Sequence, residues 1–167
     1  MDNQGVVLVS LLNMIHEANS VVTSKYPGAT CIQVSGLGTL ETIPYDYRFT
    51  FGAASSMEGY TIDGHEDKNS GKITFSAITV GKKILGVTGD LMTCTVDIYP
   101  AMKDIRSAGY EDPIFFCGLF QAVVPGITQP WYCFTPNNCV PSTSDNYIFV
   151  NAITGQVKLF PKDQQYK

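Results

Sequence analysis

The sequence is poor in charge. Charged residues make up 16% of its 167 residues, well below the ~25% usual for soluble domains. Apolar residues make up 44%, which is enough to fill a dry core and excludes disorder as the general state of the chain. The formal net charge is −4, and sequence-independent binding to nucleic acid needs clustered Lys and Arg. The composition therefore predicts one ordinary domain with no nucleic-acid partner.

Long hydrophobic runs are also missing. The longest, residues 5–15, is interrupted by Ser10 and Asn13 and is far shorter than the ~20 residues that cross a bilayer. Asp2 stands where a secretory signal has Lys or Arg. We expect no transmembrane helix, no membrane partner, and a chain that is either unsignalled or already processed. The compartment stays open, and a secreted location is favoured if a signal peptide has been removed.

The cysteines form no C-x-x-C pair and are odd in number. They are Cys31, Cys94, Cys117, Cys133 and Cys139. Neither a zinc site nor a complete disulfide framework follows from this spacing. Two interpretations remain: thiols packed as small hydrophobic side chains, or one bridge, such as Cys133 to Cys139 across a turn.

Hydrophobic periodicity predicts two helices. Apolar residues recur at three- and four-residue intervals from Leu8 to Tyr26, and Pro27-Gly28 ends this helix. The second helix has Asp97 as its N-cap, apolar positions up to Ala108 and Gly109 as its stop. Alternating patterns predict strands over residues 30–35, 45–51, 73–77, 83–87, 114–122, 131–135 and 147–153. The polar stretch 55–71 is expected to be a connection.

The order of elements and some local identities repeat along the chain. Tyr47, Phe49 and Thr50 match Tyr132, Phe134 and Thr135 at one constant spacing; Ile73, Ala77, Ile78 and Thr79 match Ile148, Ala152, Ile153 and Thr154 at another. Such a repeat fixes the architecture before any single residue is interpreted. We therefore predict an α+β fold of two tandem units, residues 1–92 and 93–167. Each is a helix followed by an antiparallel three-stranded sheet (α-β-β-β), and both share one core as a single globular domain.

The ends of these units resemble the PepSY family. Tyr26-Pro27-Gly28-Ala29 follows the first helix, and residues 150–157 read Val-Asn-Ala-Ile-Thr-Gly-Gln-Val, similar to the Val-Asp-Ala-x-Thr-Gly-x-Val stretch of that family. Asn151 replaces the usual Asp, and Val80-Gly81 in the first unit does not reproduce Gly-x-Val. The resemblance implies a helix packed on an antiparallel three-stranded sheet. It also implies a non-catalytic module that binds or restrains another protein, often an extracellular peptidase.

Two short fragments also resemble cystatin-type inhibitors of cysteine proteases. Gln33-Val34-Ser35-Gly36 and Pro130-Trp131 each match one of the two cystatin hairpins. Cystatins have one helix, however, whereas here the fragments fall in different repeats. Matches this short specify little.

Catalytic motifs are missing as well. We find no G-x-S-x-G elbow, no phosphate-binding loop and no H-E-x-x-H. We therefore expect no enzyme and no cofactor. Only one run gathers ligand-type side chains, those of Asp63, His65, Glu66 and Asp67. They are a candidate metal site, because oxygen-rich clusters bind hard cations; the alternative is a solvated hairpin tip.

The repeat also predicts which side chains point away from the helices. In the first unit these positions hold Asp46, Arg48, Thr74 and Ser76. In the second unit they hold Trp131, Cys133, Tyr147 and Phe149. Such a patch would leave hundreds of Å² of apolar surface in water, at ~25 cal/mol per Å², and monomers rarely tolerate this without a use.

Three explanations of what covers this patch remain possible. The first is the first repeat or the chain end, residues 158–166. The second is a protein partner or a second copy, since Trp, Tyr and Phe are enriched at interface hot spots. The third is a small apolar ligand in a pocket between sheet and helices, which would make the protein a carrier or pigment protein. The leading hypothesis is a non-enzymatic binding protein that engages a protein partner, with peptidase inhibition implied by the PepSY resemblance.

Overall fold

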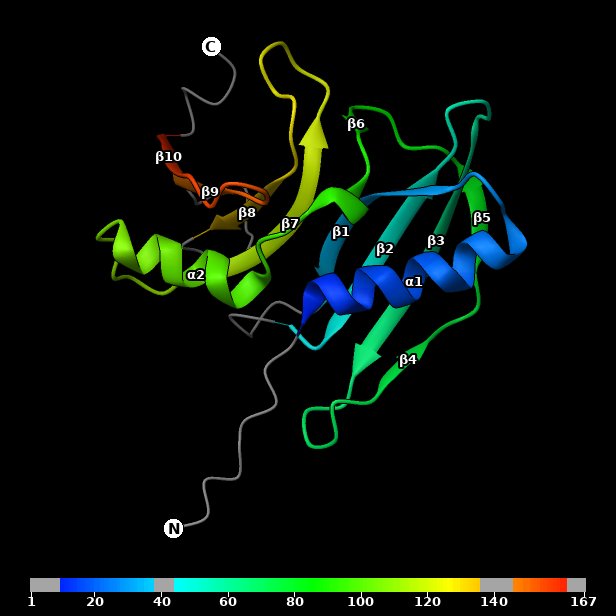
Figure 1. The fold of residues 1–167 in the computed structure, drawn as a ribbon, viewed down its shortest axis with the longest axis horizontal. Coiled ribbons are helices and arrows are strands. Elements are labelled where there is room, and N and C mark those ends of the chain that lie inside the picture. The colour runs from blue at the N-terminus through cyan, green and yellow to red at the C-terminus, as the bar shows by residue number, and fades with distance from the viewer. Residues whose placement is uncertain (1–9, 38–43, 136–145, 162–167) are drawn as a thin grey trace.

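The chain is an α+β protein in which two helices lie on one face of an antiparallel sheet (Figure 1). The computed structural model describes residues 10–37, 44–135 and 146–161, and leaves out the side chains of residues 146 and 159–161. The α+β class therefore agrees with the sequence prediction.

The bounds of the elements show where prediction and structure agree. The helices are α1, Leu11–Lys25, and α2, Ile98–Ser107, with a 3-10 turn η1 at Leu91–Thr93. The strands are β1 Thr30–Leu37, β2 Asp46–Gly52, β3 Glu58–Glu66, β4 Ile73–Phe75, β5 Thr79–Lys82, β6 Val87–Thr88, β7 Phe115–Ala122, β8 Trp131–Thr135, β9 Asn146–Asn151 and β10 Val157–Pro161. Both helices and most of the expected strands are thus confirmed within a few residues.

The sheet is continuous across the two halves of the chain. Its order is β10-β9-β8-β7-β1-β2-β3-β4, with β5 also paired to β3 and β6 to β7. All pairs are antiparallel, and β1 and β7 join the halves through the pairs Gln33–Phe120, Val34–Leu119 and Ser35–Gly118. The predicted arrangement of two three-stranded sheets is therefore replaced, in the described residues, by one ten-stranded sheet.

Three strand predictions were wrong. The stretch 55–71 holds β3, a nine-residue strand between β2 and β4. It escaped detection because only Tyr60 and Ile62 are large apolar residues on its buried side, where Gly64 and Glu66 follow. The strand expected over 83–87 is replaced by β5 and β6, and β10 was not expected.

The missed β3 also changes the internal alignment. The sequence matched residues 73–77 to 148–152. In the sheet, β9 lies beside β8, and the strand in the equivalent place beside β2 is β3, whereas β4 lies one position further out. The identity between Ile73 and Ile148 therefore does not reflect equivalent sheet positions.

Aromatic rings link the two halves of the core. Tyr47 and Phe49 on β2, and Tyr132 and Phe134 on β8, are fully buried on the helix side of the sheet. The ring of Phe116, on β7, has its centroid 5.8 Å from that of Tyr47, 6.4 Å from Tyr132 and 5.9 Å from Phe134. Offset and edge-to-face pairs of this kind stabilise a core beyond their buried area.

Both helices begin at the same carboxylate. Asp97 is the N-cap of α2, as predicted, and its Oδ1 accepts a hydrogen bond from Ile98 N at 2.8 Å. The same Oδ1 accepts from Leu11 N, in the first turn of α1, at 2.9 Å, and Oδ2 accepts from Ser10 Oγ at 2.7 Å. Two sets of amides that a helix cannot satisfy internally thus share one acceptor group.

Candidate functional site

The four predicted site residues lie together on the face of the sheet turned away from the helices. Side chains alternate between faces along a strand. On β8 and β9 the alternate residues Tyr132, Phe134, Ile148 and Val150 belong to the core under the helices. Trp131, Cys133, Tyr147 and Phe149 therefore point the other way, and Cys133 pairs with Phe149 in register. We call these four residues and Phe120 the aromatic outer surface.

Phe120 was missed by the sequence analysis. It lies on β7 directly opposite Trp131. The register of β7 against β8 shifts between Phe116 and Gly118, so that Phe116 and Leu119 both face the core although three positions separate them. A β-bulge changes the alternation in this way. Because the bulge shifts the alternation by one residue, the sequence pattern did not place Phe120 on the outer face, and nothing in the sequence indicated the bulge.

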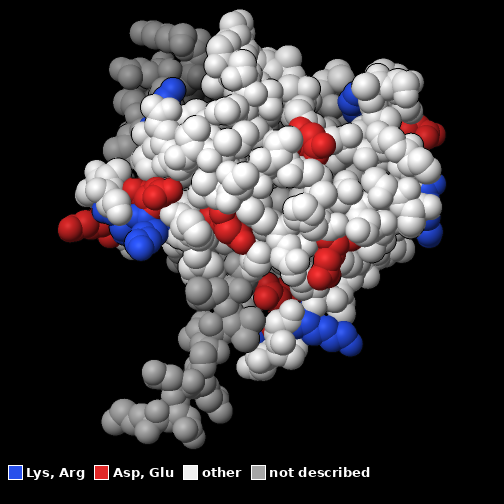
Figure 2. All heavy atoms as spheres, viewed as in Figure 1, with Lys and Arg blue, Asp and Glu red and all other residues white. Residues whose placement is uncertain are grey.

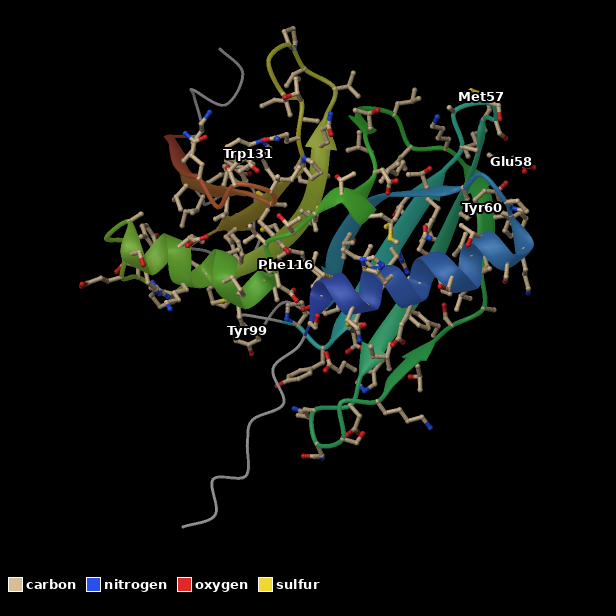
Figure 3. All side chains as sticks on the ribbon, in the orientation of Figure 1. Met57, Glu58, Tyr60, Tyr99, Phe116 and Trp131 are labelled. Atoms are coloured by element: carbon tan, nitrogen blue, oxygen red, sulfur yellow. The ribbon has the colours of Figure 1, made fainter. Side chains whose placement is uncertain are left out.

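The aromatic outer surface is partly covered rather than fully exposed. Trp131, Tyr147 and Phe149 are half-buried, and Cys133 is 6% exposed. The Lys158 ammonium, from β10, lies 5.1 Å from the centre of the Trp131 ring, a cation–π contact. The rings of Tyr147 and Phe149 stack with centroids 6.4 Å apart. The expectation of an open patch is therefore corrected. Lys158 belongs to the chain end, residues 158–166, which the sequence analysis considered as one possible cover of the patch. Figure 3 shows Trp131 beside the β7–β8 hairpin.

Cys133 is a buried thiol. Burial raises its pKa to about 12, so that the thiolate needed for attack or metal binding is scarce at neutral pH. Cys31, Cys94 and Cys133 are free, and Cys117 is disulfide-bonded. A bridge between Cys133 and Cys139 was therefore the wrong example, although the chain does contain a disulfide-bonded cysteine.

The same face of the sheet is polar on β2 and β3. The Arg48 guanidinium donates to both carboxylate oxygens of Asp63, at 2.8 and 3.0 Å. His65 Nδ1 lies 2.7 Å from Asp46 Oδ1. Both pairs are directly opposite in the β2–β3 register, the position in which polar and oppositely charged side chains stabilise a sheet. The outer face therefore changes from paired polar side chains on β2 and β3 to aromatic rings on β7, β8 and β9.

The candidate metal ligands do not converge. Asp63 and His65 take part in the ion pairs on the outer face, whereas Glu66 is buried on the helix side. Asp67 stabilises the β3–β4 turn, because its Oδ1 accepts from Ser70 N at 2.8 Å and from Asn69 N at 3.0 Å. The hydrogen bonds from Ser70, and to a smaller extent the one from Asn69, lower the pKa of this carboxyl. Within residues 10–37, 44–135 and 146–161 no group of three or more His, Cys, Asp or Glu is placed to hold a metal ion. The hairpin interpretation therefore fits Asp67, and the metal interpretation does not fit the four together.

Exposed apolar residues lie at the loop tips. Met57 is 73% exposed, Leu85 82% and Val123 60%. The three loops adjoin, because Lys83 N donates to Met57 O at 2.8 Å and Val123 N donates to Gly86 O at 3.0 Å. Figure 1 shows the β2–β3 connection, β6 and the β7–β8 connection at one end of the molecule. Periodicity could not single out these residues, because they lie in turns.

The helix face carries scattered charge. Figure 2 shows its acidic and basic side chains separated by wide uncharged areas, without a continuous basic patch in that view. Neither described helix combines the length and the apolar character that crossing a bilayer requires. Comparisons with protein-family models, curated proteins and solved structures gave no significant match.

Proposed function

We propose that this chain is a non-enzymatic binding protein that engages a protein partner through the aromatic outer surface. The observation that carries the proposal is the change of chemistry along one face of one sheet. On β2 and β3 that face is occupied by the pairs Arg48–Asp63 and Asp46–His65, whereas on β8 it carries Trp131. A face that only needs to be soluble has no reason to change in this way.

The residue types favour a protein as the partner. Trp and Tyr are enriched at interface hot spots because they combine a large apolar area with one polar group and few rotatable bonds. Trp131 and Tyr147 are half-buried before any partner binds, so that little side-chain freedom remains to be lost on association. A partner that covers them gains apolar burial at low entropic cost.

The tandem, PepSY-like architecture is part of the same proposal. The order α1-β1-β2-β3-β4 is matched by α2-β7-β8-β9-β10, and the two series run outward from the central pair β1–β7. We infer that the two halves descend from one duplicated unit. Under this interpretation the first copy kept a polar outer face while the second acquired a binding surface, and the PepSY resemblance makes a peptidase the first partner to test.

Matched variants on the same face test the proposal. Immobilised wild type, Trp131→Ala and Arg48→Ala are compared for recovery of proteins from the native source, after circular dichroism has shown that all three are folded. We expect Trp131→Ala to lower recovery of a specific partner by about tenfold or more, which corresponds to the loss of a hot spot. Arg48→Ala should retain it. Equal recovery by all three proteins contradicts the proposed surface.

The same proteins distinguish protein binding from the carrier hypothesis. If the chain carries a small apolar ligand, native mass spectrometry of the wild type should show a bound small molecule that is lost in Trp131→Ala, and the immobilised protein should retain no protein partner. That result would replace the protein-binding proposal.

A further inference from the structure

The junction of the two helix starts contains a second carboxylate. Glu66, the last residue of β3, is 5% exposed, and its Oε2 has no hydrogen-bond partner. The hydroxyl of Tyr47, fully buried on β2, also has none. A charged carboxylate in such a place is costly, because burial removes its hydration and nothing replaces it. These two orphaned oxygens distinguish the junction from the rest of the described core.

The groups around Glu66 come from several elements. Asp97 and Tyr99 approach from the start of α2, and Tyr45 and Tyr47 from β2 and its entry; all four interact electrostatically with Glu66 or with the Tyr47 hydroxyl. His65, the residue before Glu66 in the chain, also interacts with it electrostatically. The Lys68 ammonium lies 5.1 Å from the centre of the Tyr45 ring. The carboxylate of Asp97, which interacts electrostatically with Glu66, is already engaged by four donors: Ser10 Oγ and the backbone amides of Leu11, Leu12 and Ile98.

These surroundings favour a neutral Glu66. Burial raises the pKa of its carboxyl, the negative charge of Asp97 raises it further, and His65 lowers it by a smaller amount. The phenols of Tyr47 and Tyr99 are uncharged at neutral pH, since burial raises the pKa of each above the ordinary value. Among the described residues, no Lys, Arg or His forms an ion pair with the Glu66 carboxylate.

We propose that Glu66 and Asp97 form a pH-sensitive junction, in which ionisation of the buried Glu66 carboxyl loosens the docking of Ser10–Leu12 on Asp97. Ionisation places a second negative charge beside the carboxylate that holds both helices. Opening the helix starts would admit water to the buried Oε2 and so relieve the cost of this charge.

The direction of the pH effect follows from linkage. In the unfolded chain Glu66 loses its proton near its ordinary value, and in the folded protein it does so at a higher pH. Between these two values the folded state binds more protons, and the free energy of unfolding falls as pH rises. The stabilisation is fully present below the ordinary Glu value and is lost as pH rises through the folded value.

Hydrogen exchange at the capped amides tests the junction. Protection of Leu11, Leu12 and Ile98 N–H, corrected for intrinsic exchange, is measured from about pH 4 to about pH 8, a range that begins near the unperturbed Glu value. We use the wild type, Glu66→Gln and the control Glu17→Gln, whose side chain is exposed on α1. In the wild type and in Glu17→Gln we expect protection to fall by about tenfold with rising pH, which corresponds to 1.36 kcal/mol. In Glu66→Gln it should stay constant.

A second measurement does not depend on any variant. The carboxyl carbon of Glu66 is titrated in the wild type by NMR, and we expect its midpoint above the ordinary Glu value. A midpoint at or below the ordinary value overturns the proposal. So does unchanged pH dependence in Glu66→Gln.

Discussion

The backbone N–H of Leu11 donates a 2.9 Å hydrogen bond to Asp97 Oδ1, across 86 positions of sequence. The same oxygen accepts from Ile98 N. One short side chain therefore accepts from the first amides of both helices and fixes the two halves of the molecule to each other at their helix starts. Its importance can be measured directly.

Replacing Asp97 with Ala should destabilise the protein by about 2 kcal/mol, because loss of the α2 N-cap costs about 0.5–2 kcal/mol and the first amides of α1, whose own N-cap is Ser10, lose their acceptor as well. The measurement is urea unfolding at pH 7 followed by circular dichroism. Asp112→Ala is the control, since its side chain is exposed and such changes usually stay within about 0.5 kcal/mol. A loss as small as that of the control would mean that water caps the helices equally well.

Two buried tyrosines should respond oppositely to removal of the hydroxyl group. Tyr132 Oη donates to Val96 O at 2.7 Å, whereas Tyr47 Oη has no partner. Tyr132→Phe leaves a carbonyl unsatisfied and should cost about 1–2 kcal/mol, while Tyr47→Phe removes an unsatisfied group and should be neutral or slightly stabilising. Chemical denaturation of the two variants against wild type measures both values. A larger loss in Tyr47→Phe than in Tyr132→Phe would show that the Tyr47 hydroxyl is satisfied in solution.

The free buried thiols should be inert in the folded protein. Burial raises the pKa of Cys94 and of Cys133 to about 12, against an ordinary value of 9.0. Iodoacetamide at pH 8, followed by peptide mass spectrometry, should leave both unmodified until denaturant is added. Because the unfolded thiols ionise first, the protein should also lose stability as pH rises between these two values. Rapid native alkylation of Cys133 would instead show that the aromatic outer surface opens.

The cross-strand pair of Arg48 and Asp63 should contribute little stability. Both side chains are well exposed, at 49% and 38%, and exposed pairs are worth about 0.2–1 kcal/mol. A double-mutant cycle with Arg48→Gln and Asp63→Asn should give a coupling energy of about 0.5 kcal/mol that shrinks in 1 M salt. A coupling well above this range would assign the polar half of the outer face a structural role.

The sequence predicted local features well where one residue type determines the backbone. Asp97 starts α2 as a preferred N-cap, and α1 ends just before Pro27-Gly28, where Gly28 has φ of +88°. The alternation in β2 and β8 correctly placed Tyr47 and Tyr132 on the helix side. These predictions depend only on neighbours in the chain.

The errors share one physical origin. β3 has few large apolar residues, yet it lies inside the sheet because β2 supplies hydrogen bonds on one side and β4 and β5 supply them on the other. The Phe120 side chain joined the aromatic outer surface only through a bulge in β7. Partners distant in sequence decided both, and no local pattern reports such partners.

The sequence by itself determined the α+β class, the end of α1, the start of α2 and which rings of β2 and β8 enter the core, because caps, turns and periodicity act within a few residues. Only the tertiary structure decided that one sheet runs through both halves, that Asp97 serves two helices and that Glu66 is buried beside it. Those outcomes depend on hydrogen bonds and burial between residues many positions apart, and their energies exist only once the chain has folded.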